Sequence, residues 1–143
     1  MRRAGRKEEG FTLIELAIAL AILGILVAIA VPTYLNVRKT AYDSEAKQNL
    51  GAIRSVAWSH FLEHDEWAAD ITELGFDGDE DGYATDNWKY SVVDSDPYTL
   101  CAQGTTDDIT AGRNWVMVLD EEGGAKLYGP QGSCTVQETT TSS

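Results

Sequence analysis

The longest apolar stretch of the chain lies near its N-terminus, at residues 10–32. No residue from 16 to 31 carries a polar side chain, and Glu15 is the one charged residue of the stretch. As an α-helix rising about 1.5 Å per residue, residues 11–31 would cover roughly 30 Å, the thickness of the hydrocarbon core of a bilayer. The pattern therefore predicts a helix that can span a membrane.

A second pattern continues the helix beyond Pro32. Apolar residues recur there at steps of mostly three and four up to about Glu63, which indicates an amphipathic helix. Proline removes a backbone donor and disfavours helical geometry at the preceding residue, so a kink is expected at Pro32. Glycine and proline have the lowest helix propensities, so the helix is expected to be intrinsically least stable between Gly24 and Pro32. The apolar half of the helix is expected to protrude from the folded domain.

Residues 64–87 show no periodicity, and strand patterns begin at Trp88. Four segments, 88–92, 98–102, 115–119 and 126–128, favour strands, and the third is apolar enough to lie inside a sheet. The acidic and glycine-rich residues 120–124 predict a hairpin turn between the last two. The fold class is therefore α+β, a long N-terminal helix packed on a small antiparallel sheet of about four strands. Four aromatic residues should form the sheet face that covers the helix near Trp58 and Phe61; they are Trp88, Tyr90, Tyr98 and Trp115.

The charges are distributed unevenly along the 143 residues, whose net charge is −12. Residues 1–10 carry four basic side chains against two acidic ones, which marks this end as cytoplasmic by the positive-inside rule. The rest of the chain would then lie across the membrane. Its acidic surface should repel nucleic acid, so no direct nucleic-acid binding is expected.

Two ways of processing the N-terminus have to be weighed. An ordinary secretory signal would be cut after its apolar core, where the Ala-Ile-Ala of residues 28–30 offers a site. That cut would discard the whole apolar helix and leave Glu15 without a role. The other cut, between Gly10 and Phe11, keeps both.

The sequence around the second cut resembles a known family. Residues 10–15, Gly-Phe-Thr-Leu-Ile-Glu, follow a short basic leader and precede a long apolar tract. This arrangement resembles the prepilin processing motif of type IV pilins and of the pseudopilins of type II secretion. The resemblance covers residues 1–54 and becomes weak beyond about residue 60. It implies the type IV pilin fold.

The resemblance implies specific roles for several residues. In such proteins a membrane aspartyl peptidase cuts after the residue matching Gly10 and N-methylates the residue matching Phe11. The residue matching Glu15 meets the N-terminal amine of a neighbouring subunit during assembly. A carboxylate inside a membrane costs on the order of 3 kcal/mol, which a partner ammonium would offset. The alternative, a first-turn residue favoured only by the helix dipole, gains under about 1 kcal/mol.

The Gly-to-Pro span is the second feature to which the resemblance gives a role. Family members lose helical order between the residues matching Gly24 and Pro32 when they pack in a filament. The alternative for the unassembled subunit is a continuous, bent helix.

The chain is then expected to divide into four segments. Residues 1–10 are a leader that is removed, and residues 11–32 are the transmembrane and assembly helix. Residues 33–63 are an amphipathic helix that enters the globular domain, and residues 64–143 contain the acidic loop, the sheet and the disulfide-closed C-terminal region.

The two cysteines, Cys101 and Cys134, would lie in an oxidising compartment and can pair. Closing a loop of about 33 residues is worth roughly 4 kcal/mol by the chain-entropy relation. Two unrelated free thiols are the alternative. A disulfide here would resemble the one that bounds the C-terminal loop of type IV pilins.

The acidic loop raises the question of a metal. Aspartates alternate up to Gly82 as in the first part of an EF-hand loop, but Trp88 stands where a bidentate Glu would be needed. The resemblance to pseudopilins implies a calcium loop that is not an EF-hand, since major pseudopilins bind calcium in a loop of their soluble domain, and the alternative is a solvated acidic loop. The candidate calcium donors are Asp77, Asp79, Asp81 and Asp86, and no other cofactor is expected.

No arrangement of residues favours catalysis. His60 and His64 lie four apart on the helix with Glu63 between them, but no third ligand follows at a suitable spacing. They are interpreted as surface histidines at a helix end. The chain also lacks a nucleophile with a partnered base and a phosphate-binding loop, so an enzyme is not expected.

The main hypothesis is a structural subunit of a type IV pilus. It would be a single-pass inner-membrane protein with its C-terminal domain outside the cytoplasm, and later part of an extracellular homo-oligomeric helical filament. The resemblance implies prepilin peptidase and the pilus assembly machinery as partners, and adhesion, twitching motility or DNA uptake as filament activities. The alternatives are a pseudopilin of a type II secretion system and a membrane-tethered binding domain with an ordinary signal peptide.

Overall fold

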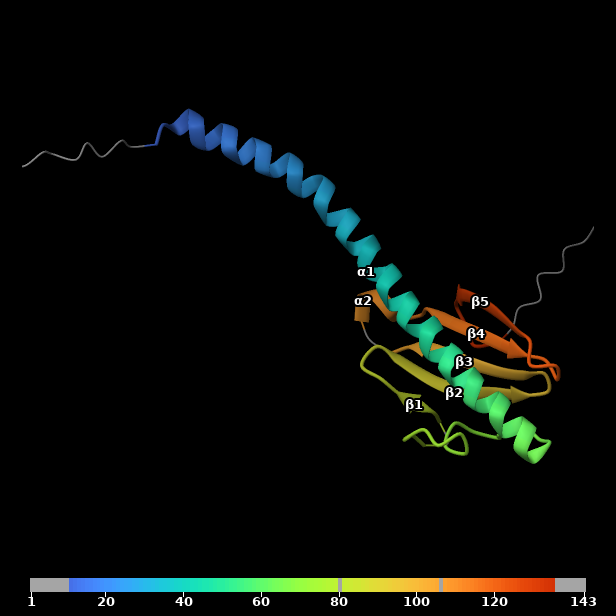
Figure 1. Cartoon of the computed structure of the whole chain (residues 1–143). Coiled ribbons are helices and arrows are strands. Elements are labelled where there is room, and N and C mark those ends of the chain that lie inside the picture. Colours follow the sequence, from blue (N-terminus) through green and yellow to red (C-terminus); the bar gives the residue numbers. More distant parts are fainter. Residues whose placement is uncertain (1–10, 80, 106, 136–143) are drawn as a thin grey trace, which may run out of the picture. The chain divides into compact units, whose positions relative to one another are not determined.

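The computed structural model describes residues 11–79, 81–105 and 107–135. Its main elements are one long helix and an antiparallel sheet, which confirms the predicted α+β class (Figure 1). The elements are α1 (Leu13–His64), β1 (Tyr83–Ala84), β2 (Trp88–Ser95), β3 (Tyr98–Gly104), α2 (Asp107–Thr110), β4 (Asn114–Leu119) and β5 (Ala125–Gln131). Contacts divide the chain into two units, up to Arg38 and from Lys39 onward, and α1 contributes to both.

The first unit contains the apolar part of α1. Every residue from 11 to 41 is exposed, and α1 is long and apolar enough to cross a membrane by length and composition. The helix runs through Gly24 and Pro32 without a break, as in the continuous alternative for an unassembled subunit. The division into segments at residues 10, 32 and 63 stays a prediction.

The sheet is a meander in which each strand pairs with the next along the chain, in the order β1-β2-β3-β4-β5. β3 is the middle strand and five of its seven residues are buried. β4 also lies inside the sheet, as its apolar sequence predicted. The sheet has five strands where about four were predicted, and the additional strand is β1, whose two residues are too few to show an alternating pattern.

One stripe of α1 packs on one face of the sheet. Ala46, Leu50, Ile53 and Ala57 recur at steps of three and four and are almost completely buried. The opposing face carries the four aromatic residues predicted for it, and all four belong to the core. The loop after α1 closes one end of this core with Ala68, Ile71 and Leu74.

Polar contacts at both ends of the stripe set the rotation of α1 on the sheet. At the N-terminal end, the carboxylate of Asp43 accepts hydrogen bonds from Arg113 at 2.5 Å and from the indole N–H of Trp115 at 3.1 Å. Toward the other end, before Ala57, the guanidinium of Arg54 donates to the carbonyl of Gly123 in the β4–β5 turn. A helix rotated away from this orientation would leave these polar groups without partners.

The β4–β5 turn forms at residues 120–124, as predicted. The amide of Asp120 donates to the carbonyl of Gly124 at 3.1 Å, and Gly123 has a φ of 81°. A β-carbon on Gly123 would lie 2.7 Å from the ring of Trp58, so both backbone conformation and space require glycine here.

A disulfide joins Cys101 in β3 to Cys134, which follows β5. The two Cα atoms are 5.6 Å apart and 33 positions separate the residues in sequence. Cys101 is fully buried and Cys134 is half-buried. The bond therefore ties the segment after the edge strand to the middle of the sheet.

The buried tyrosines should make the domain sensitive to alkali. Burial raises the pKa of Tyr90 to about 12, and burial together with the charges of Glu73 and Asp70 raises the pKa of Tyr98. A phenol with a raised folded pKa stabilises the fold below its unfolded pKa, and this stability is lost as the pH rises toward the folded pKa. The thermal midpoint of the full chain in detergent should therefore fall between about pH 10 and pH 12.

The Tyr90→Phe variant separates this effect from general alkaline damage. It loses the hydrogen bond that Asn49 donates to the hydroxyl at 2.8 Å, about 1 kcal/mol at neutral pH. Its midpoint should nevertheless fall less steeply above pH 10 than that of the unchanged chain. Tyr128→Phe, at an exposed position of β5, serves as the control with an unchanged slope. Equal slopes for all three proteins would contradict the assignment.

Removing the disulfide should destabilise the domain. Cys101→Ser with Cys134→Ser opens a loop of 33 residues, a loss of roughly 4 kcal/mol of unfolding free energy by the chain-entropy relation. Thermal unfolding monitored by circular dichroism in detergent, with and without reductant, measures this. The reductant should lower the midpoint of the unchanged chain and leave that of the double variant unmoved. A midpoint that reductant does not move in either protein would contradict a stabilising bond.

Candidate processing and assembly site

The predicted processing site lies at the start of the described chain. Gly10 falls outside the described residues, and Phe11 is 88% exposed. Residues 11 and 12 are not helical, and α1 begins at Leu13. The position proposed for the new N-terminus therefore precedes the first turn of the helix.

Thr12 and Glu15 bond to each other across the first turn of α1. The backbone N–H and the hydroxyl of Thr12 donate to Oε2 of Glu15 at 3.0 and 2.7 Å. The backbone N–H of Glu15 donates in return to the hydroxyl of Thr12 at 3.3 Å. This reciprocal pattern is a capping box, in which side chains satisfy amides that the helix start leaves without partners.

The capping box gives Glu15 a role in the single chain that was not part of the sequence interpretation. Glu15 is exposed, and its carboxylate stabilises the helix start together with Thr12. The signal was present in the sequence as Thr followed three residues later by Glu before an apolar run. Thr12 is thus a site residue that was not predicted from the sequence. The pairing of Glu15 with the amine of a neighbouring subunit stays a prediction.

The acidic loop uses one of its candidate calcium donors to stabilise itself. Oδ1 of Asp79 accepts hydrogen bonds at 3.0 Å from the backbone N–H groups of Asp81 and Gly82. Asp77, Asp79, Asp81 and Asp86 are all exposed. In the part of the chain that the structure describes, no three acidic, histidine or cysteine side chains are gathered as for a metal ion. Calcium binding by this loop stays a prediction.

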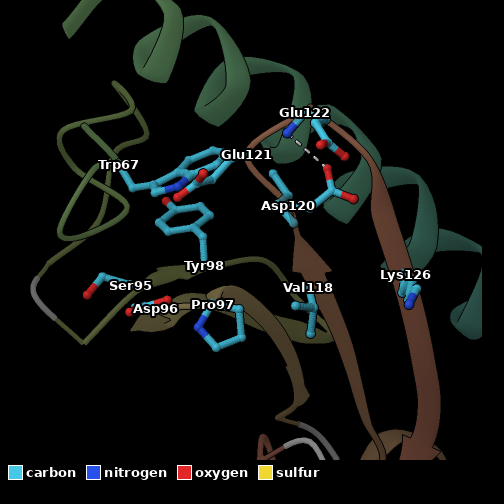
Figure 2. A pocket seen from close by; sticks show the side chains of 11 residues that line it. Trp67, Ser95, Asp96, Pro97, Tyr98, Val118, Asp120, Glu121, Glu122 and Lys126 are labelled. Atoms are coloured by element: carbon cyan, nitrogen blue, oxygen red, sulfur yellow. Dashed lines mark hydrogen bonds between the residues drawn. The ribbon is translucent and has the colours of Figure 1, made fainter. Parts of the chain in front are cut away.

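A hollow of about 510 Å³ lies beside the β4–β5 turn (Figure 2). Trp67, Pro97 and Tyr98 form its apolar wall, and the carboxylates of its rim belong to Asp96, Asp120, Glu121 and Glu122. The ring of Trp67 stacks on Tyr98 at 4.5 Å and on Phe61 at 4.4 Å between centroids. These aromatic residues therefore pack the loop after α1 against the sheet, which is a structural role.

Comparisons with known proteins agree with the motif and the fold. The family model of the prokaryotic N-terminal methylation motif matches residues 5–31, which include the predicted cleavage position and Glu15. The type IV major pilin protein PilA of Myxococcus xanthus is 43% identical over 74 residues, 52% of this chain and 34% of that protein.

Two further relatives give the same description. PilE of Neisseria gonorrhoeae, also a type IV major pilin protein, is 41% identical over 68 residues, 48% of this chain and 41% of that protein. The fimbrial protein EcpC of Eikenella corrodens is 39% identical over 106 residues, 73% of this chain and 61% of that protein. The matched part of the chain thus spans between about a third and three fifths of these relatives. The methylation motif, these relatives and the long helix on an antiparallel sheet together support a type IV pilin.

Proposed function

We propose that the chain is the structural subunit of a type IV pilus and assembles into a homo-oligomeric helical filament. The observation that carries this proposal is the exposed apolar surface of α1. Large apolar side chains are exposed from Phe11 to Val37, and most of them by more than half of their surface. Each gains about 1.5–3 kcal/mol when it is buried, so this surface requires lipid or other protein around it.

In this proposal the apolar part of α1 is buried first in lipid and later against other subunits. The apolar part of α1 first lies in the inner membrane, and it then packs against the same segment of neighbouring subunits. Basic residues precede the helix and a disulfide lies beyond it, which supports a C-terminal domain outside the cytoplasm before assembly. The finished filament is extracellular, where adhesion, twitching motility and DNA uptake are its candidate activities.

Glu15 connects processing with assembly in this proposal. Prepilin peptidase cuts between Gly10 and Phe11 and methylates Phe11, and the pilus assembly machinery then brings Glu15 to the new amine of a neighbouring subunit. The cut lies before Thr12, so the capping box survives it. An ammonium close to this carboxylate offsets the cost of taking it into an apolar bundle.

The comparisons give the pseudopilin alternative no support. The relatives reported above are named as pilins and a fimbrial protein, and none as a component of a secretion system or as an enzyme. Electron microscopy of sheared surface fibres, with intact-mass analysis of their subunit, tests the proposal. Filaments built of a chain that starts at methylated Phe11 are expected. A mature chain starting at Val31 would contradict it and support an ordinary signal peptide.

Replacing Glu15 should separate insertion from assembly. Glu15→Ala should still be cut and remain in the membrane, but the yield of sheared filaments should fall at least about tenfold, because no carboxylate is left to meet the neighbouring amine. Thr12→Ala is the matched control, since it removes the capping box and keeps the carboxylate. It should retain filaments. An equal loss in both variants would assign the effect to helix capping and contradict the pairing role.

The residue before the cut should control maturation. The peptidase has to accommodate a small side chain there, so Gly10→Ala should be processed in part and Gly10→Leu should accumulate as uncut precursor in the membrane fraction. Intact-mass spectrometry of that fraction distinguishes precursor from mature chain. Efficient maturation of Gly10→Leu would count against the assigned position.

A further inference from the structure

The histidines near the C-terminal end of α1 form a pair that the proposed function does not use. His60 and His64 are the two histidines of the chain, and their rings lie on one side of the helix with centroids 4.3 Å apart. The ring planes differ by 19°. Histidines at positions i and i+4 of a helix have the spacing at which both can reach one metal ion.

The hydrogen bonds of the two rings determine which nitrogen is free. Nδ1 of His60 lies 3.2 Å from the carbonyl oxygen of Glu66, and Nδ1 of His64 lies 3.1 Å from the carbonyl oxygen of His60. A carbonyl oxygen only accepts, so these contacts require a proton on each Nδ1. In the neutral imidazole the lone pair then lies on Nε2, the arrangement in which histidines bind metals while the other nitrogen donates to a carbonyl.

A hollow next to His60 and His64 is also bordered by carboxylates. It has a volume of about 510 Å³ and is lined by His60, His64, Glu66, Trp67, Ala69 and Glu73. The amide of Ala69 donates to Oε2 of Glu73 at 2.7 Å, which holds that carboxylate in the loop after α1. The chain turns back into this loop at Asp65, which has a φ of 59°. Two imidazoles from the helix and two carboxylates from the loop therefore border one space.

We propose that His60 and His64 bind a divalent copper ion through their Nε2 atoms, with Glu73 and water as further ligands. Nitrogen and oxygen donors suit Cu²⁺ in tetragonal geometry, and Cu²⁺ binds such donors more tightly than Zn²⁺ or Ni²⁺. The partial negative charge at the helix C-terminus and the acidic chain both favour a cation here. Among the described residues no three ligands are already gathered, so the ion recruits Glu73 and links α1 to the loop after it.

The two rings have to turn slightly for this site to close. They lie nearly parallel, whereas lone pairs directed at one ion must converge. His64 is exposed and His60 is half-buried, and the terminal torsion of histidine is broad, so this adjustment meets little resistance.

The test is a copper titration of the full chain in detergent micelles, with any affinity tag removed. Isothermal titration in a buffer with glycine as competitor should give one Cu²⁺ per chain. His60→Gln and His64→Gln should each weaken binding by at least about tenfold, since removing even the hydrogen-bond partner of a ligand has effects of that size. Glu63→Gln is the matched control, because Glu63 lies between the histidines and does not line the hollow.

A measurement on the unchanged chain makes the result independent of the variants' folding. The pulsed electron paramagnetic resonance spectrum of bound Cu²⁺ should show the remote nitrogens of two imidazoles, and excess Ca²⁺ should not displace the ion. Binding without imidazole nitrogens in the spectrum would overturn the proposal. Displacement by Ca²⁺ would also overturn it, as would histidine variants that both bind Cu²⁺ as tightly as the unchanged chain, since carboxylates would then hold the ion.

Discussion

The burial of one stripe of α1 against one face of the sheet is the contact on which the folded domain depends. Two of its four residues, Ala46 and Ala57, are small, so the helix backbone can approach the aromatic residues of the sheet closely. Between them Leu50 and Ile53 provide the larger apolar side chains. Apolar burial has no preferred direction, and the orientation comes from the polar contacts of Asp43 and Arg54.

Several of the basic side chains of the domain make contacts between α1 and the sheet. Arg113 bonds to Asp43, and the ammonium of Lys47 lies 4.1 Å from the ring centroid of Trp115. Arg54 bonds to the β4–β5 turn. Three of the few basic side chains thus act between α1 and the sheet. The carboxylates of residues 120–122 and of Asp77, Asp79 and Asp81 remain at the surface.

Much of this fold could be predicted from the sequence, because periodicity reports burial directly. The long helix, the four longer strands and the 120–124 turn follow from spacing and from the need for glycine at positive φ. β1 could not be predicted, since its two residues owe their conformation to pairing with Lys89 and Tyr90. The ion pair of Asp43 and Arg113 joins residues 70 positions apart, and such a contact leaves no local pattern.

The residues of the candidate sites also differ in how far local sequence patterns could predict their contacts. The capping box of Thr12 and Glu15 is local and could have been found from its spacing. The Asp-rich loop has a local pattern that predicts metal ligands, and this prediction stays untested. Asp79 accepts two backbone N–H bonds, because a turn offers amides to a nearby carboxylate.

In the proposed filament of identical subunits, the negative charge of the domains and the apolar surface of α1 would act against each other. Acidic domains repel, but salt limits this repulsion to a distance of about 8 Å at physiological ionic strength. The apolar segment of α1 gains about 1.5–3 kcal/mol for each large side chain that leaves water, and it offers many of them between Phe11 and Val37. In the proposed filament the helices would therefore supply the association energy, and the charge of the domain surface could vary without preventing assembly.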